Sequence, residues 1–222
     1  MKSYDILIIG AGSIGTPLAY NLAKKGKKVC VIEMNASTGR GQNRAAIGGL
    51  RATFSDPAKI KICAVSINEI SHMKENHGID VDWVEGGYIY PIFEEQTEKN
   101  LKELLKLQKS MGLNIDWVSA EEIKERVPGI RPEGLRGGTF SPNDGSASPL
   151  KTTGAFYKLA RECGAEFNFH EKVVSMEVKG GKIVSVKTDK ETYCADLIIN
   201  AAGPFSREIG EMCGVDIPVY PD

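Results

Sequence analysis

Residues 4–15 read Tyr-Asp-Ile-Leu-Ile-Ile-Gly-Ala-Gly-Ser-Ile-Gly, an apolar run that leads into three closely spaced glycines. The run Tyr4–Ile9 is typical of a buried parallel strand, and the order strand, glycines, helix is the context in which this glycine pattern binds a dinucleotide. Gly10 permits a tight turn, Gly12 lets a pyrophosphate approach the backbone, and Gly15 lets the next helix pack closely. Free N–H groups at that helix start favour an anion. The stretch therefore predicts an α/β domain that binds a dinucleotide.

The residues after this turn complete a strand, helix, strand unit. The helix is expected to be apolar on one face, which is formed by Ile14, Leu18 and Leu22. A second strand, Lys28–Ile32, ends at Glu33, which lies 21 residues after Gly12. This spacing is typical of a carboxylate that accepts both hydroxyls of an adenosine ribose, and it disfavours NADP because a 2′-phosphate would be repelled. The alternative is a glycine-rich turn without a ligand.

The segment from residue 35 to residue 53 departs from a standard NAD-binding domain, which would continue with a short helix and a strand. It is rich in Gly, Ala, Ser and Thr, and it can bring many backbone N–H groups against a flat ligand. A mobile surface loop is the alternative. However, an unstructured connection of 19 residues inside a compact domain is usually functional or disordered.

A second turn of small residues lies far downstream, where the strand Asp196–Asn200 leads into residues 201–204, Ala-Ala-Gly-Pro, and a helix expected over Phe205–Cys213. Small residues there would let the chain close over the same pyrophosphate, and an ordinary strand-to-helix turn is the alternative. The preceding pattern predicts an antiparallel meander that returns to the parallel sheet, over Glu171–Val178, Lys182–Asp189 and Glu191–Cys194. NAD-binding domains are not usually organised in this way.

The middle of the chain predicts helices alternating with short strands. Asp56-Pro57 combines an N-cap acid with proline at the first helical position. The helix that it opens is expected to run to about Asn76, with an apolar stripe of Ile60, Ala64, Ile67 and Ile70. The other expected elements are a strand over Gly87–Phe93, helices over Glu94–Met111, Glu121–Arg126 and Thr152–Cys163, a loop over Pro128–Gly138 and a strand over Val215–Tyr220.

The composition narrows the classes of partner. The chain has 222 residues with 28 Lys and Arg against 29 Asp and Glu, a net charge of −1, which argues against nucleic acid as the main partner. The longest apolar stretch, Ile6–Ile9, is too short for a membrane span, and no signal-peptide pattern is present, so a cytoplasmic protein is expected. The five cysteines form no CxxC pair and are expected to be reduced and mostly buried. No metal site is assigned.

Taken together, the sequence resembles the FAD-dependent oxidoreductases of the D-amino acid oxidase type, in the branch with glycine oxidase, sarcosine oxidase β-subunits and archaeal amino-acid dehydrogenase β-subunits. Five segments carry the resemblance in order along the chain: GAGSIG with Glu33, GGLRATFSDP at 48–57, GGYIYPI at 86–92, NDGSASP at 143–149 and INAAGPFS at 199–206. These segments are specific to the superfamily and do not define a substrate.

The resemblance implies an α/β fold with a Rossmann-like FAD-binding domain, which contains a parallel sheet plus an antiparallel meander, and part of an inserted α+β substrate domain. The FAD-binding domain is expected over residues 1–84 and 145–214, and the partial substrate domain over residues 85–144 and 215–222. Chains of the family continue beyond this point. The sequence is therefore expected to be the truncated or split N-terminal portion of a longer enzyme, and the portion alone is expected to be inert.

The resemblance also implies FAD as the cofactor, bound without a covalent link. In related dimethylglycine and sarcosine dehydrogenases a histidine of this loop bonds to the flavin, whereas Arg44 stands at the corresponding place here. The residues expected to contact FAD are Gly10, Gly12, Ser13, Ile14, Gly15, Glu33, Met34, Arg44, Ala45, Ala46, Gly48, Gly49, Leu50, Val173, Ala201, Ala202 and Gly203.

By the same resemblance, the reaction is oxidation of a carbon that bears an amine, with hydride passing to the flavin. Arg51 matches an arginine that holds the substrate carboxylate in the sarcosine oxidases, and a planar guanidinium suits that task. A structural or phosphate-binding cation is the alternative for Arg51. Tyr88 and Tyr90 could line the pocket, and a place in the core or on the sheet face is their alternative.

Two other functions remain open at this stage. One is a flavin dehydrogenase of a hydroxy acid or glycerol phosphate, which would share the FAD motifs. The other is a non-catalytic FAD-binding subunit of a hetero-oligomer. The expected partners are a small amine or amino-acid substrate and a homo- or hetero-oligomer.

Overall fold

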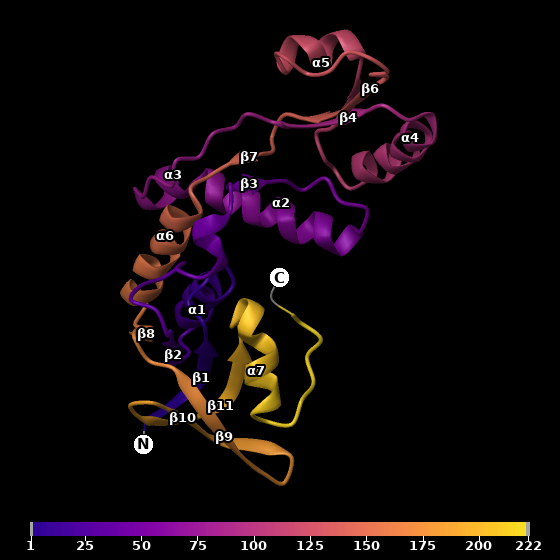
Figure 1. Ribbon diagram of the computed structural model, residues 1–222. Coiled ribbons are helices and arrows are strands. Elements are labelled where there is room, and N and C mark those ends of the chain that lie inside the picture. The colour runs from indigo at the N-terminus through magenta and orange to yellow at the C-terminus, as the bar shows by residue number, and fades with distance from the viewer. Residues whose placement is uncertain (1, 221–222) are drawn as a thin grey trace. The chain divides into compact units, whose positions relative to one another are not determined.

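The computed structural model describes residues 2–220 and divides into two compact units (Figure 1). The first contains residues 1–47 and 149–222, and the second contains residues 48–148. These units part at residues 47 and 148, whereas the expected domains part at residues 84, 144 and 214. Met1, Pro221 and Asp222, which the expected domains include, lie outside the described residues.

A six-stranded sheet forms the centre of the first unit, in the order β8-β2-β1-β11-β10-β9. β1 lies in the parallel part, where Ile8 pairs with Val31 on one side and with Ile199 on the other. β10 pairs antiparallel with both β11 and β9. The strands are β1 (Lys2–Ile9), β2 (Val29–Ile32), β8 (Glu166–Asn168), β9 (Val173–Lys179), β10 (Lys182–Thr188) and β11 (Thr192–Asn200). The carboxyl ends of β1, β2 and β11 therefore meet at one edge of the sheet.

The helix after the glycine turn, α1 (Gly15–Lys24), packs beside α6 (Pro149–Glu162) (Figure 1). Its buried face is formed by Gly15, Thr16, Ala19, Tyr20 and Ala23, so the expected face is wrong. Ile14 precedes the helix and is 67% exposed, and Leu18 and Leu22 are only partly buried. Small residues on the buried face let the two helices approach closely. The ring centroids of Tyr20 and Phe156 lie 6.1 Å apart there.

The second unit contains a three-stranded antiparallel sheet in the order β4-β6-β5 and a short two-stranded pair, β3-β7. The strands are β3 (Gly49–Leu50), β4 (Tyr88–Ile92), β5 (Asp116–Val118), β6 (Gly137–Ser141) and β7 (Gly145–Ser146). The helices are α2 (Pro57–Ser71), α3 (Met73–His77), α4 (Glu95–Ser110) and α5 (Ala120–Arg126).

Capping explains where two of these helices begin. Asp56 caps α2 by accepting a hydrogen bond from the Lys59 N–H at 2.9 Å, and Pro57 is the first helical residue, as predicted. The helix predicted to reach Asn76 instead breaks at His72, whose ψ of 11° leaves the helical region, and α3 follows. Ser119 and Glu122 form a reciprocal capping box at the start of α5.

Three strand predictions need correction. The expected strands Glu191–Cys194 and Asp196–Asn200 are one strand, β11, because Ala195 pairs with Tyr4 and the ladder to β1 continues through it. Residues 215–220 form no strand and run as irregular chain after α7. The predicted loop 128–138 overlaps β6, where a Cβ at Gly138 would collide with the Tyr90 carbonyl oxygen. Gly138 is therefore needed for strand pairing, whereas residues 128–136 form no helix or strand, as predicted.

The cysteine expectation is correct in one respect only. All five cysteines are free thiols, and Cys30, in β2, is buried. Cys63, Cys194 and Cys213 are only partly buried, and Cys163 is exposed, so the expectation of mostly buried thiols is wrong. Among residues 2–220, no helix has the length and apolar character needed to cross a membrane.

Candidate cofactor site

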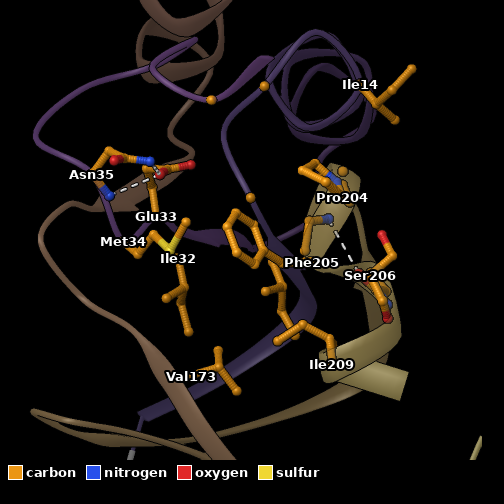
Figure 2. A pocket seen from close by; sticks show the side chains of 18 of the residues that line it. Ile14, Ile32, Glu33, Met34, Asn35, Val173, Pro204, Phe205, Ser206 and Ile209 are labelled. Carbon is orange, nitrogen blue, oxygen red and sulfur yellow. Dashed lines mark hydrogen bonds between the residues drawn. The ribbon is translucent and has the colours of Figure 1, made fainter. Parts of the chain in front are cut away.

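A cavity of about 400 Å³ opens in the first unit where β1, β2 and β11 end. This is the edge of a parallel sheet at which α/β proteins bind ligands. Figure 2 shows Glu33 and Asn35 on one wall and Pro204, Phe205 and Ile209 on the opposite one. The predicted site residues that line it are Gly10, Gly12, Ser13, Ile14, Glu33, Met34, Val173, Ala201, Ala202 and Gly203.

The three glycines of the first turn have different reasons to be glycine. Gly10 has a φ of +107°, and a Cβ there would collide with the Ala201 carbonyl oxygen. A Cβ on Gly15 would collide with the Gly10 carbonyl oxygen. Gly12 is different, because its nearest neighbour would be Asn43 Oδ1 at 3.4 Å, so a methyl group would fit. The open space at Gly12 suits the close approach of a phosphate to the backbone.

The backbone N–H groups at the start of α1 provide the polar part of this wall. The Ser13 N–H donates to Asn43 Oδ1 at 3.2 Å, and Ile14 supplies no side-chain cap to the helix. An amide oxygen therefore occupies a position that a phosphate oxygen could take. The exposed Asn43 bond is exchangeable, so the helix start fits the pyrophosphate of a dinucleotide.

Glu33 is 9% exposed and its carboxylate is held from both sides. One oxygen, Oε2, accepts from the Ala11 N–H at 2.8 Å. The other, Oε1, accepts from the Asn35 N–H at 2.8 Å and from the Asn35 side-chain amide at 2.7 Å. A carboxylate has about four acceptor positions, so Glu33 can still accept a hydroxyl from a ligand. The arrangement fits the ribose of an adenosine.

Apolar side chains form the floor of the cavity. Val173 and Ile209 belong to the buried core that underlies it, and Met34 is 40% exposed at its rim. Figure 2 shows Met34 and Ile32 above Val173 on this floor. An apolar surface next to fixed polar groups is typical of a site for a flat aromatic ring.

A buried polar network stiffens the wall behind Val173. Glu171 Oε1 accepts from the hydroxyls of Thr188 and Tyr193, both at 2.7 Å. The Asn168 side-chain amide lies 3.2 Å from the Tyr193 oxygen and 3.3 Å from the Cys30 sulfur. Burial raises the pKa of the Cys30 thiol to about 12, and it also raises the pKa of Tyr193. These groups therefore stay protonated at neutral pH.

Other predicted site residues do not line this cavity. Gly15 lies beneath the turn, and the 3₁₀ helix η1 (Gln42–Ala45) carries Arg44 and Ala45, which Ala46 follows. Gly48, Gly49, Leu50 and Arg51 belong to the second unit. There the Arg51 guanidinium donates to the Thr53 carbonyl at 2.7 Å and lies over the Phe54 ring at 4.0 Å.

Sequence reasoning missed several residues that line the cavity. Asn35 is the most important, because it holds Glu33, and a side-chain amide two residues after the acid was a readable signal. Gly39–Asn43 also contribute, within the segment predicted to face a flat ligand. The 3₁₀ helix η2 (Gly203–Phe205) and α7 (Ser206–Glu211) supply the opposite wall.

A mainly parallel sheet, a glycine turn at the end of its first strand and a buried acid at the end of its second define a dinucleotide-binding α/β protein. Residues 5–222 match the family described as FAD dependent oxidoreductase, and the chain belongs to that family. The resemblance read from the sequence is confirmed, as are the fold class and FAD as the cofactor of the family.

Two relatives and one solved structure illustrate the similarity. Glycine oxidase from Bacillus licheniformis is 30% identical over 228 residues, which cover 99% of this chain and 59% of the relative. Mitochondrial dimethylglycine dehydrogenase from Homo sapiens is 29% identical over 219 residues, 98% of this chain and 25% of the relative. The structure of L-proline dehydrogenase from P. horikoshii superposes with a TM-score of 0.90 at 28% identity, over 96% of this chain and 56% of that one. The chain thus spans less than two thirds of each.

Proposed function

We propose that this protein is an FAD-dependent oxidoreductase that oxidises the C–N bond of an amino acid or secondary amine, such as sarcosine, glycine or proline. The activities for which glycine oxidase, dimethylglycine dehydrogenase and L-proline dehydrogenase are named support this substrate class. The observation that carries the proposal is the cavity at the carboxyl edge of the sheet, where the glycine turn and Glu33 converge.

The adenosine and pyrophosphate of FAD are the parts assigned to this cavity. Glu33 would accept a ribose hydroxyl, and Gly12 with Ser13 would face the pyrophosphate. The apolar floor at Val173 would lie against the adenine. The returning turn Ala201–Gly203 would close over the same phosphates. We retain noncovalent attachment, because the loop position that holds a histidine in related dehydrogenases is Arg44.

Arg51 is assigned to the substrate carboxylate. Its guanidinium is half-buried and is held by the Thr53 carbonyl and the Phe54 and Tyr90 rings, with centroids 4.0 and 5.4 Å away. A guanidinium fixed in this way keeps N–H groups available for a second acceptor. When bound, the flavin ring would supply the electron sink for amine oxidation, and the protein would supply binding and orientation. Arg44, Ala45, Ala46, Gly48, Gly49 and Leu50 remain proposed flavin contacts.

The assignment is tested by the cofactor and by substrate-dependent reduction. The full-length protein should purify yellow and should release FAD, rather than FMN or NAD, on denaturation. Under anaerobic conditions, glycine, sarcosine or proline should bleach the flavin absorbance, whereas hydroxy acids and glycerol phosphate should not. Bleaching only by the second group would favour a hydroxy-acid or glycerol-phosphate dehydrogenase. A flavin that neither group reduces would indicate a non-catalytic subunit.

A further inference from the structure

The segment that carries Arg51 is secured by a set of hydrogen bonds within the second unit. The Phe54 N–H donates to the Ala52 carbonyl at 2.9 Å, and the Gln108 side-chain amide donates to the Phe54 carbonyl at 3.1 Å. The Ala52 N–H donates to Oδ1 of Asp144 at 3.0 Å, although Asp144 lies 92 residues further along the chain. A remote carboxylate thus holds the residue next to Arg51.

Asp144 is itself firmly placed. It is 3% exposed, and its backbone carbonyl accepts from the Gly87 N–H at 2.8 Å. The next residue, Gly145, pairs with Leu50 in the β3-β7 ladder. Both neighbours of Arg51 in the chain are therefore tied to the region of Asp144. Leu50 pairs with Gly145, and the Ala52 N–H donates to the Asp144 carboxylate.

The hydrogen bond to the Ala52 backbone does not by itself explain why residue 144 is an aspartate. An asparagine could accept from the Ala52 N–H equally well without burying a charge. Moreover, Oδ2 of Asp144 is buried and has no hydrogen-bond partner among residues 2–220, and the same is true of Thr53 Oγ1. A buried carboxylate with a vacant oxygen is costly, so a compensating partner is expected nearby.

Arg51 is one of the groups that oppose the cost of burying the Asp144 carboxylate. Burial raises the pKa of the Asp144 carboxyl above its ordinary value, while the Ala52 N–H, the Ser141 hydroxyl and the Arg51 charge oppose this shift. Lys and Arg side chains prefer a charge partner when half-buried, and a guanidinium has five N–H donors to share. Arg51 uses one of them on the Thr53 carbonyl.

We propose that Asp144 is a positioning residue for Arg51. Its carboxylate fixes the Ala52 backbone, and its negative charge orients the guanidinium so that the remaining N–H groups face the carboxylate of a substrate. This inference rests on the proposed function, because it takes Arg51 as the group that binds that carboxylate. Asp144 does not touch the substrate.

Carboxylate binding to the FAD-loaded protein tests the inference without requiring turnover. Calorimetric titration with acetate measures the dissociation constant for the wild type, Asp144→Asn, Gln108→Ala and the same Asp144→Asn change in an Arg51→Lys background. Asp144→Asn keeps the size and an acceptor for Ala52 but removes the charge. Gln108→Ala loosens the same segment without any change of charge, and it is the matched control.

Asp144→Asn should weaken acetate binding roughly tenfold, within the range of coupling between neighbouring residues, and Gln108→Ala should weaken it less than about threefold. In the Arg51→Lys background, Asp144→Asn should add less than about a twofold change, because the group through which it acts is gone. With an amine substrate, Asp144→Asn should raise KM and leave kcat nearly unchanged.

Other results would overturn the inference. These are wild-type protein that does not bind acetate, an Asp144→Asn protein that binds it as tightly as the wild type, and an undiminished effect in the Arg51→Lys background. If Asp144→Asn does not retain FAD, Asp144→Ser replaces it, since it is smaller and also uncharged. Wild-type protein that binds acetate but is not reduced by amines contradicts the proposed function, whereas the acetate comparison still decides the role of Asp144.

Discussion

Asn35 binds the Glu33 carboxylate twice, with its backbone N–H at 2.8 Å and its side-chain amide at 2.7 Å. The two residues are neighbours at the end of β2, so the acid that faces the cavity is oriented by the chain that immediately follows it. Hydrogen bonds to a charged acceptor are stronger than neutral ones, and two of them restrict the carboxylate to one orientation. If Glu33 binds FAD as proposed, Asn35 acts on that binding through Glu33.

Replacement of Asn35 by alanine should weaken FAD binding about three- to tenfold, because one of the three hydrogen bonds that hold the Glu33 carboxylate is lost. The dissociation constant is measured by adding FAD to apoprotein and following the quenching of flavin fluorescence. Asn21→Ala is the matched control, since the Asn21 side chain is exposed on α1 and donates to the Pro17 carbonyl, away from the cavity. Equal constants for wild type and Asn35→Ala would show that Glu33 needs no such support.

Replacement of Glu33 by alanine should have a larger effect. A hydrogen bond to a charged group contributes about 1.5–3 kcal/mol, so the loss of one ribose bond should raise the FAD dissociation constant roughly 10- to 100-fold. The same fluorescence titration measures it. Glu177→Gln, on the exposed β9-β10 hairpin, should bind FAD like the wild type. An unchanged constant for Glu33→Ala would remove Glu33 from the site.

The parallel core of the fold was predictable because its signals are local. The run Tyr4–Ile9, the glycines after it and Glu33 all lie within 33 residues, and each has a single physical reason. One of the strands that were not predicted is β6, because its residues are explained only by distant partners. β6 begins with two glycines and pairs with β4, and the approach of the Tyr90 carbonyl explains why residue 138 has no side chain.

The residues of the candidate site also divide into those that local sequence patterns predict and those that depend on distant parts of the chain. Apart from Gly15, the predicted residues at both glycine turns line the cavity, because strand ends in a parallel sheet meet at one edge. The face of α1 was predicted wrongly, because the pattern of large apolar residues was given more weight than the small residues that face α6. The link between Asp144 and Ala52 spans 92 residues and leaves no periodic signal in the sequence.

Two glycine substitutions should separate ligand binding from folding. Gly12→Ala places a methyl group in ordinary van der Waals contact with Asn43 Oδ1, so the thermal midpoint should change little while FAD binding weakens about tenfold or more as the phosphate approach is obstructed. Gly15→Ala forces a Cβ against the Gly10 carbonyl oxygen, so it should destabilise the protein by about 1–3 kcal/mol or more. Thermal melts of the apoprotein and FAD titrations measure both effects. Matching losses of stability in the two variants would contradict the different roles assigned to these glycines.

Cys30 should be protected from alkylation at pH 8, whereas Cys163 should react. Burial raises the pKa of the Cys30 thiol to about 12 from an ordinary value of 9.0, so little thiolate forms and the side chain is also inaccessible. Cys163 is exposed on the surface. Iodoacetamide labelling of the native protein followed by peptide mass spectrometry distinguishes the two residues.

The raised pKa of Cys30 also predicts how the stability of the protein depends on pH. The folded state keeps the thiol proton to a higher pH than the unfolded state does. The contribution of Cys30 to stability is therefore intact below about pH 9 and is lost as the pH rises towards 12. Cys30→Ala should therefore flatten the loss of stability between these pH values in urea unfolding, and labelling of Cys30 as fast as Cys163 would show that the thiol is not buried.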